Sequence, residues 1–596
     1  MLPKDNYLQR IEKIELVLQR LIQKKNAFAW VRFCAVLILF TALYFLFPLG
    51  WIYCAIAAII MSAVFIRVVF IDLENKTAIE HQRHLLTINE DELKVLNHQF
   101  HHIEDGTTHT PTDHPYANDL DILGKSSLFQ YINRTTSEMG SAVLAKWLLY
   151  PANIQTIIKR QDAVKELCND TEWQQALQAY GKSGKIKINT KQKLQDWLKD
   201  ENSFFSGNYW NWLRYVLPAG IIIVLVLNGS DIIPYQIRNY ALLLYALFAY
   251  LIAKKVTPIH NQLSKIAEEL EVLEESIRLI EKSSFKSDLL IQMRSGFVQE
   301  HDTASSSLKQ LKKILEKFDL RYNPMIFIPL DIILQWDLQQ ALDLNTWKKK
   351  NKTAVLNWFD ILGEFEALNS FSTLYFNNPE WSFPSFKTEH FFIQGTAIGH
   401  PLINKNNCIL NDININDKGE IMLITGSNMA GKSTYLRSIG TNTVLAMAGA
   451  PVFAGNFCLS PVQLISSMRI ADNLAESTST FYAELKKLKT IINSVNSHEK
   501  IFILLDEILR GTNSLDRHTG SVALVKQLIN KEAACIIATH DVELAKLKNE
   551  FPAKIQNYHF DVEVNNEELY FDYKLKTGIC TSLNASILMK KIGIEL

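Results

Sequence analysis

The residues best suited to chemistry lie in one stretch, 421–434, which reads I-M-L-I-T-G-S-N-M-A-G-K-S-T. An apolar run ends at a glycine, and Gly-Lys-Ser follows at 431–433. This spacing is typical of a phosphate-binding loop between a buried strand and a helix, because glycines let backbone N–H groups face an anion and the helix dipole points at it. We therefore expect the following loop residues to bind ATP: Gly426, Ser427, Asn428, Met429, Ala430, Gly431, Lys432, Ser433 and Thr434.

Charged and hydroxyl side chains give this site its expected chemistry. Lys432 is expected to reach the β- and γ-phosphates, and the Ser433 hydroxyl to bind Mg²⁺. A second apolar run, 501–505, delivers Asp506 and Glu507 at its end, and ligands bind at the carboxyl ends of parallel strands. We expect Asp506 to hold Mg²⁺ through its water shell and Glu507 to act as general base.

A third apolar run, 534–538, leads to Thr539 and His540. A lone histidine is more often structural than catalytic, but at a strand end His540 could contact the γ-phosphate and respond to hydrolysis. The 510–513 segment, Arg-Gly-Thr-Asn, is either a simple turn or a loop that meets the nucleotide of a second subunit.

Two apolar segments predict membrane hairpins. Residues 33–66 carry no charged side chain, and one helix of that length would reach about 50 Å, well beyond a hydrocarbon core of ~30 Å. The Pro-Leu-Gly turn at 48–50 divides the segment into two arms. A second hairpin is predicted at 209–253, with buried core helices as the alternative. The flanking basic residues that predict a cytoplasmic base are Lys24, Lys25, Arg32, Arg67, Lys254 and Lys255.

Composition limits the partners. The chain has 62 basic and 62 acidic residues, so net charge gives no support for a nucleic-acid partner. The densest basic cluster is Lys348, Lys349, Lys350 and Lys352, for which a solvated face competes with a DNA contact. Seven cysteines without C-x-x-C pairs argue for reduced thiols and against a zinc site.

The fold class that follows is a multidomain α plus α/β protein. Leucines and isoleucines at three-four spacing predict paired, coiled-coil-like helices between 263 and 318, and from about 391 short apolar runs alternate with helical patterns, which predicts a mostly parallel sheet. The domains expected are an N-terminal helix at 1–30, hairpins at 31–71 and 209–253, a helical core at 72–208, an arm and second core part at 254–385, and an ATPase domain at 386–596.

Three motifs resemble those of the MutS DNA mismatch repair family. They are the phosphate loop at 425–437, the segment L-L-D-E-I-L-R-G-T-N-S-L-D at 504–516, and D-N-L at 472–474 running into S-T-F-Y-A-E-L at 479–485. The resemblance extends to His-Pro at 400–401 and to the helical stretch 124–151. Ser427, Ala430 and Leu509 stand where the family has a proline, a glycine and a glycine.

The resemblance implies an ATPase domain that works as a homodimer, with Ser479 and Thr480 of a signature loop facing the other subunit's γ-phosphate. The alternative for this pair is an N-cap of the following helix. The helices at 263–318 would correspond to the family's lever arms, whose far ends clamp DNA, whereas the first 115 residues leave no room for both the mismatch-reading and connector domains.

The resulting hypothesis is a multi-pass protein of the inner (cytoplasmic) membrane, with its large domains in the cytoplasm. It would hydrolyse ATP as a dimer and bind DNA, as a mismatch-repair-like or structure-sensing clamp, with the lipid bilayer as a further partner. The alternative is a cassette-type membrane ATPase coupled to transport or remodelling without DNA.

Overall fold

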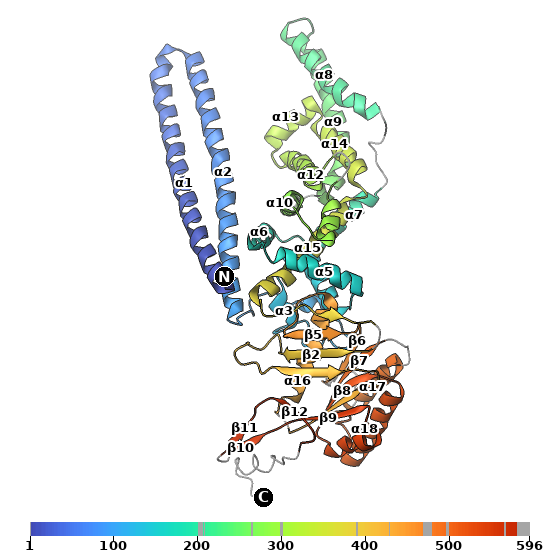
Figure 1. Cartoon of the computed structure of the whole chain (residues 1–596). Helices are drawn as coiled ribbons and strands as arrows, with labels where there is room; N and C mark the ends of the chain where they lie inside the picture. The colour runs from blue at the N-terminus through green and yellow to red at the C-terminus, as the bar shows by residue number, and fades with distance from the viewer. Residues whose placement is uncertain are drawn as a thin grey trace.

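The computed structural model describes residues 2–200, 207, 209–263, 266–298, 302–388, 391–427, 430–468, 480–495, 500–565 and 568–580. Two long hairpins lie at one end of the molecule and an α/β domain at the other, with a helical body between them (Figure 1).

The first hairpin consists of two continuous helices, α1 (Pro3–Leu46) and α2 (Trp51–Leu96). The turn between them is the 3₁₀ segment η1 (Phe47–Leu49) followed by Gly50, whose φ of 122° is open to glycine but strained for other residues. The helix predicted for the first 26 residues and the first apolar arm are therefore one helix, and the two helices pack along each other. Near the base of the apolar part, Arg32 forms a 2.8 Å ion pair with Asp72.

The helical body is built around α15 (Val355–Asn377), which is buried along most of its length. Gly363 of α15 touches the backbone of Met139 and Gly140 on α4, so the two helices approach closely. The helices of the body are α3 (Leu128–Ile132), α4 (Glu138–Leu149), α5 (Ile154–Leu167), α6 (Thr171–Lys182), α7 (Ile188–Lys199), α10 (Ala267–Lys282), α11 (Asp288–Ser295), α12 (Ala304–Phe318) and α14 (Trp336–Asn351), with short 3₁₀ segments η2 (Thr107–His109) and η3 (Asp319–Tyr322).

Helices α10 and α12 pair with each other, as the periodicity between 263 and 318 predicts. They are short, at 16 and 15 residues, and pack onto the body. The second hairpin, α8 (Tyr209–Gly229) and α9 (Tyr235–Leu263), projects beyond them, and the apolar helix α13 (Pro324–Leu334) packs beside it. About half of the large apolar side chains on this hairpin are exposed.

The α/β domain contains a six-stranded sheet in the order β12-β9-β4-β8-β7-β6. Its strands are β4 (Ile421–Thr425), β6 (Gln463–Ser467), β7 (Ile501–Asp506), β8 (Ala534–Thr539), β9 (Ile555–Phe560) and β12 (Leu575–Thr577); all neighbours are parallel except β12 and β9. A second sheet holds β1 (Ser385–Phe386), β2 (Ile393–Ile398), β3 (Asn411–Ile415) and β5 (Asn456–Leu459), and β10 (Glu563–Asn565) pairs with β11 (Glu568–Tyr570).

Both faces of the central strands are buried, which explains their uninterrupted apolar runs. On β4, Leu423 joins the core formed with α17 (Thr480–Val495) and α18 (Ser514–Asn530), whereas Ile424 faces the core that continues through α16 (Lys432–Ala448) into the helical body. The remaining elements, η5 (Val542–Lys546) and α19 (Leu547–Glu550), follow β8. The strands predicted at 421–424, 501–505 and 534–538 are β4, β7 and β8, and their carboxyl ends meet at one sheet edge.

Candidate active site

The segment between β4 and α16 bends sharply at its two glycines. Gly426 has φ of 153°, and a Cβ there would lie 2.9 Å from the Phe560 carbonyl oxygen. Gly431 has φ of 104°, a left-handed conformation that disfavours side chains, and it caps the start of α16. The chain therefore enters α16 with the helix N-terminus at the sheet edge, which is the arrangement the sequence predicts.

Lys432 is buried and folds back over this loop. Its Nζ donates hydrogen bonds to the carbonyl oxygens of Gly426 at 2.7 Å and Ser427 at 2.8 Å. Burial lowers the pKa of Lys432, while the nearby carboxylates of Glu507 and Asp506 act in the opposite direction. One lysine and two acidic side chains thus belong to a single electrostatic cluster.

Asp506 lies at the end of β7 and meets the Ser433 hydroxyl, which donates a hydrogen bond to it. Burial raises the pKa of Asp506 in spite of this bond. Its Oδ1 is buried and has no hydrogen-bond partner among the described residues. A buried oxygen of this kind, next to a hydroxyl, fits the coordination preferences of hydrated Mg²⁺.

Glu507 lies between the side chains of His540 and Arg510. One carboxylate oxygen contacts Nε2 of His540, and the other lies 2.9 Å from Nε of Arg510. The hydrogen bond from His540 lowers the pKa of Glu507, so the carboxylate stays ionised. Nδ1 of His540 lies 2.9 Å from the Gly426 carbonyl oxygen, so one ring links the ends of β4, β7 and β8.

The backbone around Glu507 is strained. Glu507 and Leu509 have φ of 51° and 60°, in the left-handed region that costs non-glycine residues roughly 1 kcal/mol. Leu509 stands where the resemblance predicts glycine, and its conformation gives the physical reason for a glycine there. The buried Glu484 of α17 supports this turn by accepting a hydrogen bond from the backbone N–H of Leu509.

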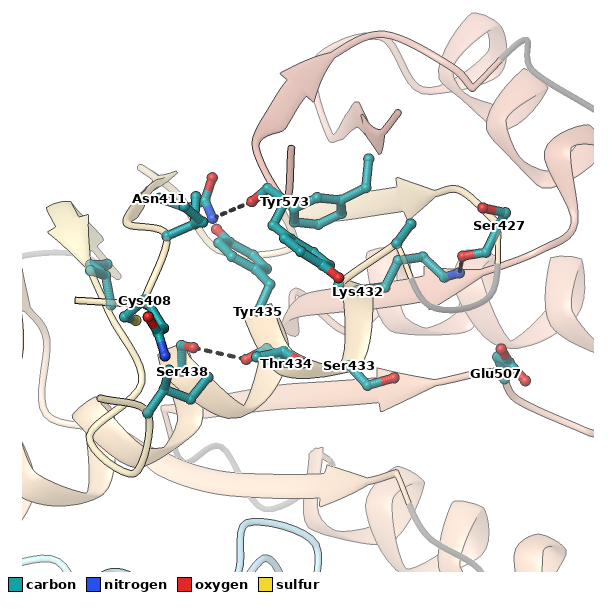
Figure 2. Close-up of a pocket in the computed structure, with 17 residues that line it drawn as sticks. Cys408, Asn411, Ser427, Lys432, Ser433, Thr434, Tyr435, Ser438, Glu507 and Tyr573 are labelled. Carbon is teal, nitrogen blue, oxygen red and sulfur yellow. Dashed lines mark hydrogen bonds between the residues drawn. The ribbon is translucent and has the colours of Figure 1, made fainter. Parts of the chain in front are cut away.

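A cavity of about 390 Å³ lies beside the loop, within the size range of small-ligand pockets. Figure 2 shows Tyr573 and Asn411 on one side of Lys432 and Glu507 on the other. The Tyr573 ring packs on Gly431, and Asn411 Nδ2 donates to the Tyr573 carbonyl oxygen at 3.0 Å. Sequence reasoning missed Tyr573, because no local pattern marks a residue that follows β11 and returns to a loop far earlier in the chain.

The structure brings together Lys432, Ser433, Asp506, Glu507 and His540. Ser427, Ala430, Gly431 and Thr434 also line the cavity, while Gly426 lies against Phe560. Asn428, Met429 and Ser479 lie outside the described residues, and Thr480 begins α17 without a described side chain.

The lysine cluster of α14 is partly engaged within the chain. Lys348 lies over the Trp197 ring and donates to the Asp200 carbonyl oxygen at 2.7 Å. Lys350 pairs with Asp302 at 2.9 Å. These contacts favour the solvated, intramolecular interpretation of the cluster.

Together the fold and this site define a multidomain, mostly helical protein with an α/β domain whose parallel strands deliver a lysine, a hydroxyl and two carboxylates to one edge. The family model described as MutS domain V matches residues 422–590.

Relatives match over more of the chain. The DNA mismatch repair protein MutS of Thermotoga maritima is 24% identical over 516 residues, covering 78% of this chain and 61% of the relative. The DNA mismatch repair protein MSH3 of Candida albicans is 25% identical over 560 residues, covering 80% and 53%. A mitochondrial DNA mismatch repair protein mutS homolog of Sarcophyton glaucum is 35% identical over 193 residues, covering 31% and 19%.

These matches support membership of the MutS family. The chain spans 61% or less of the length of these three relatives.

Proposed function

We propose that this protein is a membrane-anchored MutS-type ATPase that binds ATP with Mg²⁺ and hydrolyses it as a homodimer. The observation that carries the proposal is the meeting of Lys432, Ser433, Asp506, Glu507 and His540 at one sheet edge beside the cavity.

Each side chain has a role that its position supports. Lys432 leaves the loop carbonyls to bind the β- and γ-phosphates, and its low exposure strengthens that contact. Ser433 and Asp506 hold Mg²⁺, which when bound neutralises charge on the phosphates. Glu507, kept ionised by His540, accepts a proton from the attacking water, and His540 is placed to contact the γ-phosphate.

Two substitutions test this assignment. Lys432→Ala removes the cation that faces the phosphates, so we expect loss of nucleotide binding, measured by titration with a fluorescent ATP analogue. Glu507→Gln keeps the size of the side chain but removes the base, so ATP binding persists while turnover is lost and an ATP-bound dimer accumulates. Wild-type turnover by Glu507→Gln would rule out the general-base role.

A second copy of the chain is the proposed partner at this edge. The start of α17 lies against the 510–513 loop, since Phe481 packs on Gly511. Nearby apolar side chains remain exposed in the single chain, including Tyr482 at 60% and Leu515 at 74%. Burial of these side chains would favour association of two copies. Sedimentation of Glu507→Gln with and without ATP tests the dimer.

The hairpins support attachment to the inner membrane with the large domains in the cytoplasm. In the part of the chain that the structure describes, four helices are long and apolar enough to cross a bilayer: α1, α2, α8 and α9. Their exposed apolar side chains would otherwise face water. We expect the protein to stay with membranes in alkaline carbonate and to enter solution only with detergent. Release by carbonate alone would remove the membrane assignment.

DNA is the proposed macromolecular substrate, because the matched relatives are named as DNA mismatch repair proteins. Binding of the detergent-solubilised protein to homoduplex, mismatched and branched DNA across a salt series tests this role. Absence of salt-sensitive binding, combined with solute-dependent ATP turnover in vesicles, would favour the second candidate, a cassette-type ATPase for transport or remodelling. The first hairpin has no charged side chain along 33–66, which argues against a polar transport path through it.

A further inference from the structure

Helix α13 differs from the other helices of the body in what it exposes. Its N-terminal half presents Met325, Ile326 and Ile328 at 88%, 52% and 53% exposure. Its acidic residue, Asp331, is buried and accepts a 2.9 Å hydrogen bond from the backbone N–H of Asp337. The helix therefore turns its charge inward and its apolar side chains outward, which is the reverse of a helix that faces water.

The position of α13 along α9 is fixed at both ends. Before the helix, Arg321 donates a 3.2 Å hydrogen bond to the Ala253 carbonyl oxygen. Ala253 ends the apolar run of α9 and is followed by Lys254 and Lys255. After the helix, Gln335 lies 3.4 Å from the Tyr245 carbonyl oxygen. Eight residues of helix separate these two carbonyls, so α13 rises by about 12 Å along the apolar part of α9.

The outer surface of the hairpin is apolar at the same level. Tyr250 and Leu251 of α9 are exposed by 65% and 52%. On the body side, Arg214 pairs with Asp343 at 2.9 Å and marks the level at which charged side chains begin on α8. The exposed face of α13 is therefore continuous with the apolar surface of the second hairpin. Both lie on the apolar side of the level that Arg214 marks.

We propose that α13 is a third membrane element, which lies in the lipid–water interface with Met325, Ile326 and Ile328 in contact with lipid. This inference rests on the proposed membrane attachment and extends it, because it places the end of the helical body in the bilayer surface. A lipid surface fits better than DNA, since the exposed face offers no cation for phosphates. It follows that the end of the body carries lipid contacts where the family resemblance predicts a DNA clamp.

Fluorescence quenching in lipid vesicles tests the proposal. In the full-length protein, serine replaces the five cysteines that are not buried, and the buried Cys535 and Cys580 are kept. Single cysteines are then introduced by Met325→Cys on α13, Ile223→Cys on α8 as the hairpin reference, and Lys349→Cys on the exposed face of α14. Each is labelled with an environment-sensitive nitrobenzoxadiazole dye, and the vesicles contain phosphatidylcholine with or without nitroxide-labelled acyl chains.

We expect nitroxide lipid to reduce emission at positions 325 and 223 to a similar extent and to leave position 349 unchanged. Quenching at 223 without quenching at 325 would overturn the α13 inference and leave the hairpin assignment standing. A blue-shifted but unquenched dye at 325 would show that protein, such as a second copy, covers α13, and would also overturn it. No quenching at 223 would instead reject the membrane attachment on which the inference rests.

Discussion

Glu507 has two side-chain partners and an unusual backbone conformation. Its carboxylate is shared between His540 and Arg510, and its backbone is in the left-handed region. These contacts keep the group ionised but also occupy both oxygens. The proposed general base must therefore release one partner before it can accept a proton from water, which makes the Glu507–His540 contact a point of control over turnover.

His540→Ala is expected to move the acid limb of the ATPase pH profile to higher pH. The hydrogen bond from His540 is the main cause of the lowered pKa of Glu507, so its removal raises that pKa. A base works only when deprotonated, and activity is then lost earlier as pH falls. The measurement is turnover at saturating ATP across pH 4–8, read as the position of the limb.

His84→Ala serves as the matched control, because His84 lies on α2, far from the site in sequence and in a different element. Its profile should overlay that of the unaltered protein. An unmoved acid limb in His540→Ala, with the fold intact, would show that His540 does not set the ionisation of Glu507.

The site residues that could be predicted from the sequence are those that directly follow a predicted strand or begin a predicted helix. Lys432 and Ser433 follow a strand and open a helix, and Asp506 and Glu507 end a neighbouring strand, so the sheet brings them together. Glu484 and Tyr573 reach the site from elements remote in the chain. Their contacts depend on tertiary packing, for which one sequence holds no local signal.

At the scale of elements, the 507–511 turn depends on α17. From its buried position, Glu484 accepts a hydrogen bond from the Leu509 backbone N–H of that turn. This connects the helix that follows the predicted signature loop to the carboxylates of β7. A shift of α17 on dimerisation would therefore change the position of Glu507.

Glu484→Ala should lower both stability and turnover. The Leu509 backbone N–H would lose its acceptor, and an unsatisfied buried donor costs about 1–3 kcal/mol. We expect a lower thermal midpoint for the detergent-solubilised protein and reduced ATP turnover with ATP binding retained. Lys489→Ala, on the exposed face of the same helix, is the control and should change neither quantity. A normal midpoint in Glu484→Ala would contradict the supporting role.

Element types were predictable where periodicity was strong, as in β4, β7, β8 and the α10–α12 pair. The extent of α1 was not predicted as one helix. The charged first part of the helix is followed by its apolar arm, and no proline or glycine lies between residues 4 and 47. The composition therefore changes while the helix continues. Composition marks a change of surroundings, which does not have to coincide with a helix end.

For the whole molecule, a buried network joins the first hairpin to the body. Glu92 of α2 pairs with Arg134, which precedes α4, and also accepts a 2.8 Å hydrogen bond from Asn377 at the end of α15. Asn377 in turn accepts a 2.8 Å hydrogen bond from the Tyr7 hydroxyl of α1. Both arms of the hairpin are thus fixed to the helix that leads towards the α/β domain.

Glu92→Gln is expected to destabilise the protein strongly. The side chains of Glu92 and Arg134 are only 4% and 8% exposed, and removal of one charge from a buried pair costs about 3–5 kcal/mol. Thermal unfolding in detergent should show a midpoint lowered by several degrees. Glu90→Gln, two residues away on the exposed side of α2, should melt normally. Equal midpoints for the two variants would refute a structural role for the pair.

This network could not be derived from the sequence, because Tyr7, Glu92 and Asn377 are far apart in the chain and carry no shared motif. What the sequence did predict at this scale was a chain of helical and α/β parts with apolar hairpins. The attachment of the first hairpin to the helical body depends on buried side chains that hydrogen-bond to one another across the two parts.

The unbroken length of α1 has a mechanical consequence. The helix has 44 residues and no joint between its anchored base and its tip, so it acts as a rod of about 66 Å. A rotation of the helical body by about 5° would displace the far tip by about 6 Å for a rod of that length. Small rotations at the base of α1 therefore produce large displacements at the 47–50 turn. In the same way, a displacement of the turn would rotate the base of this rigid helix.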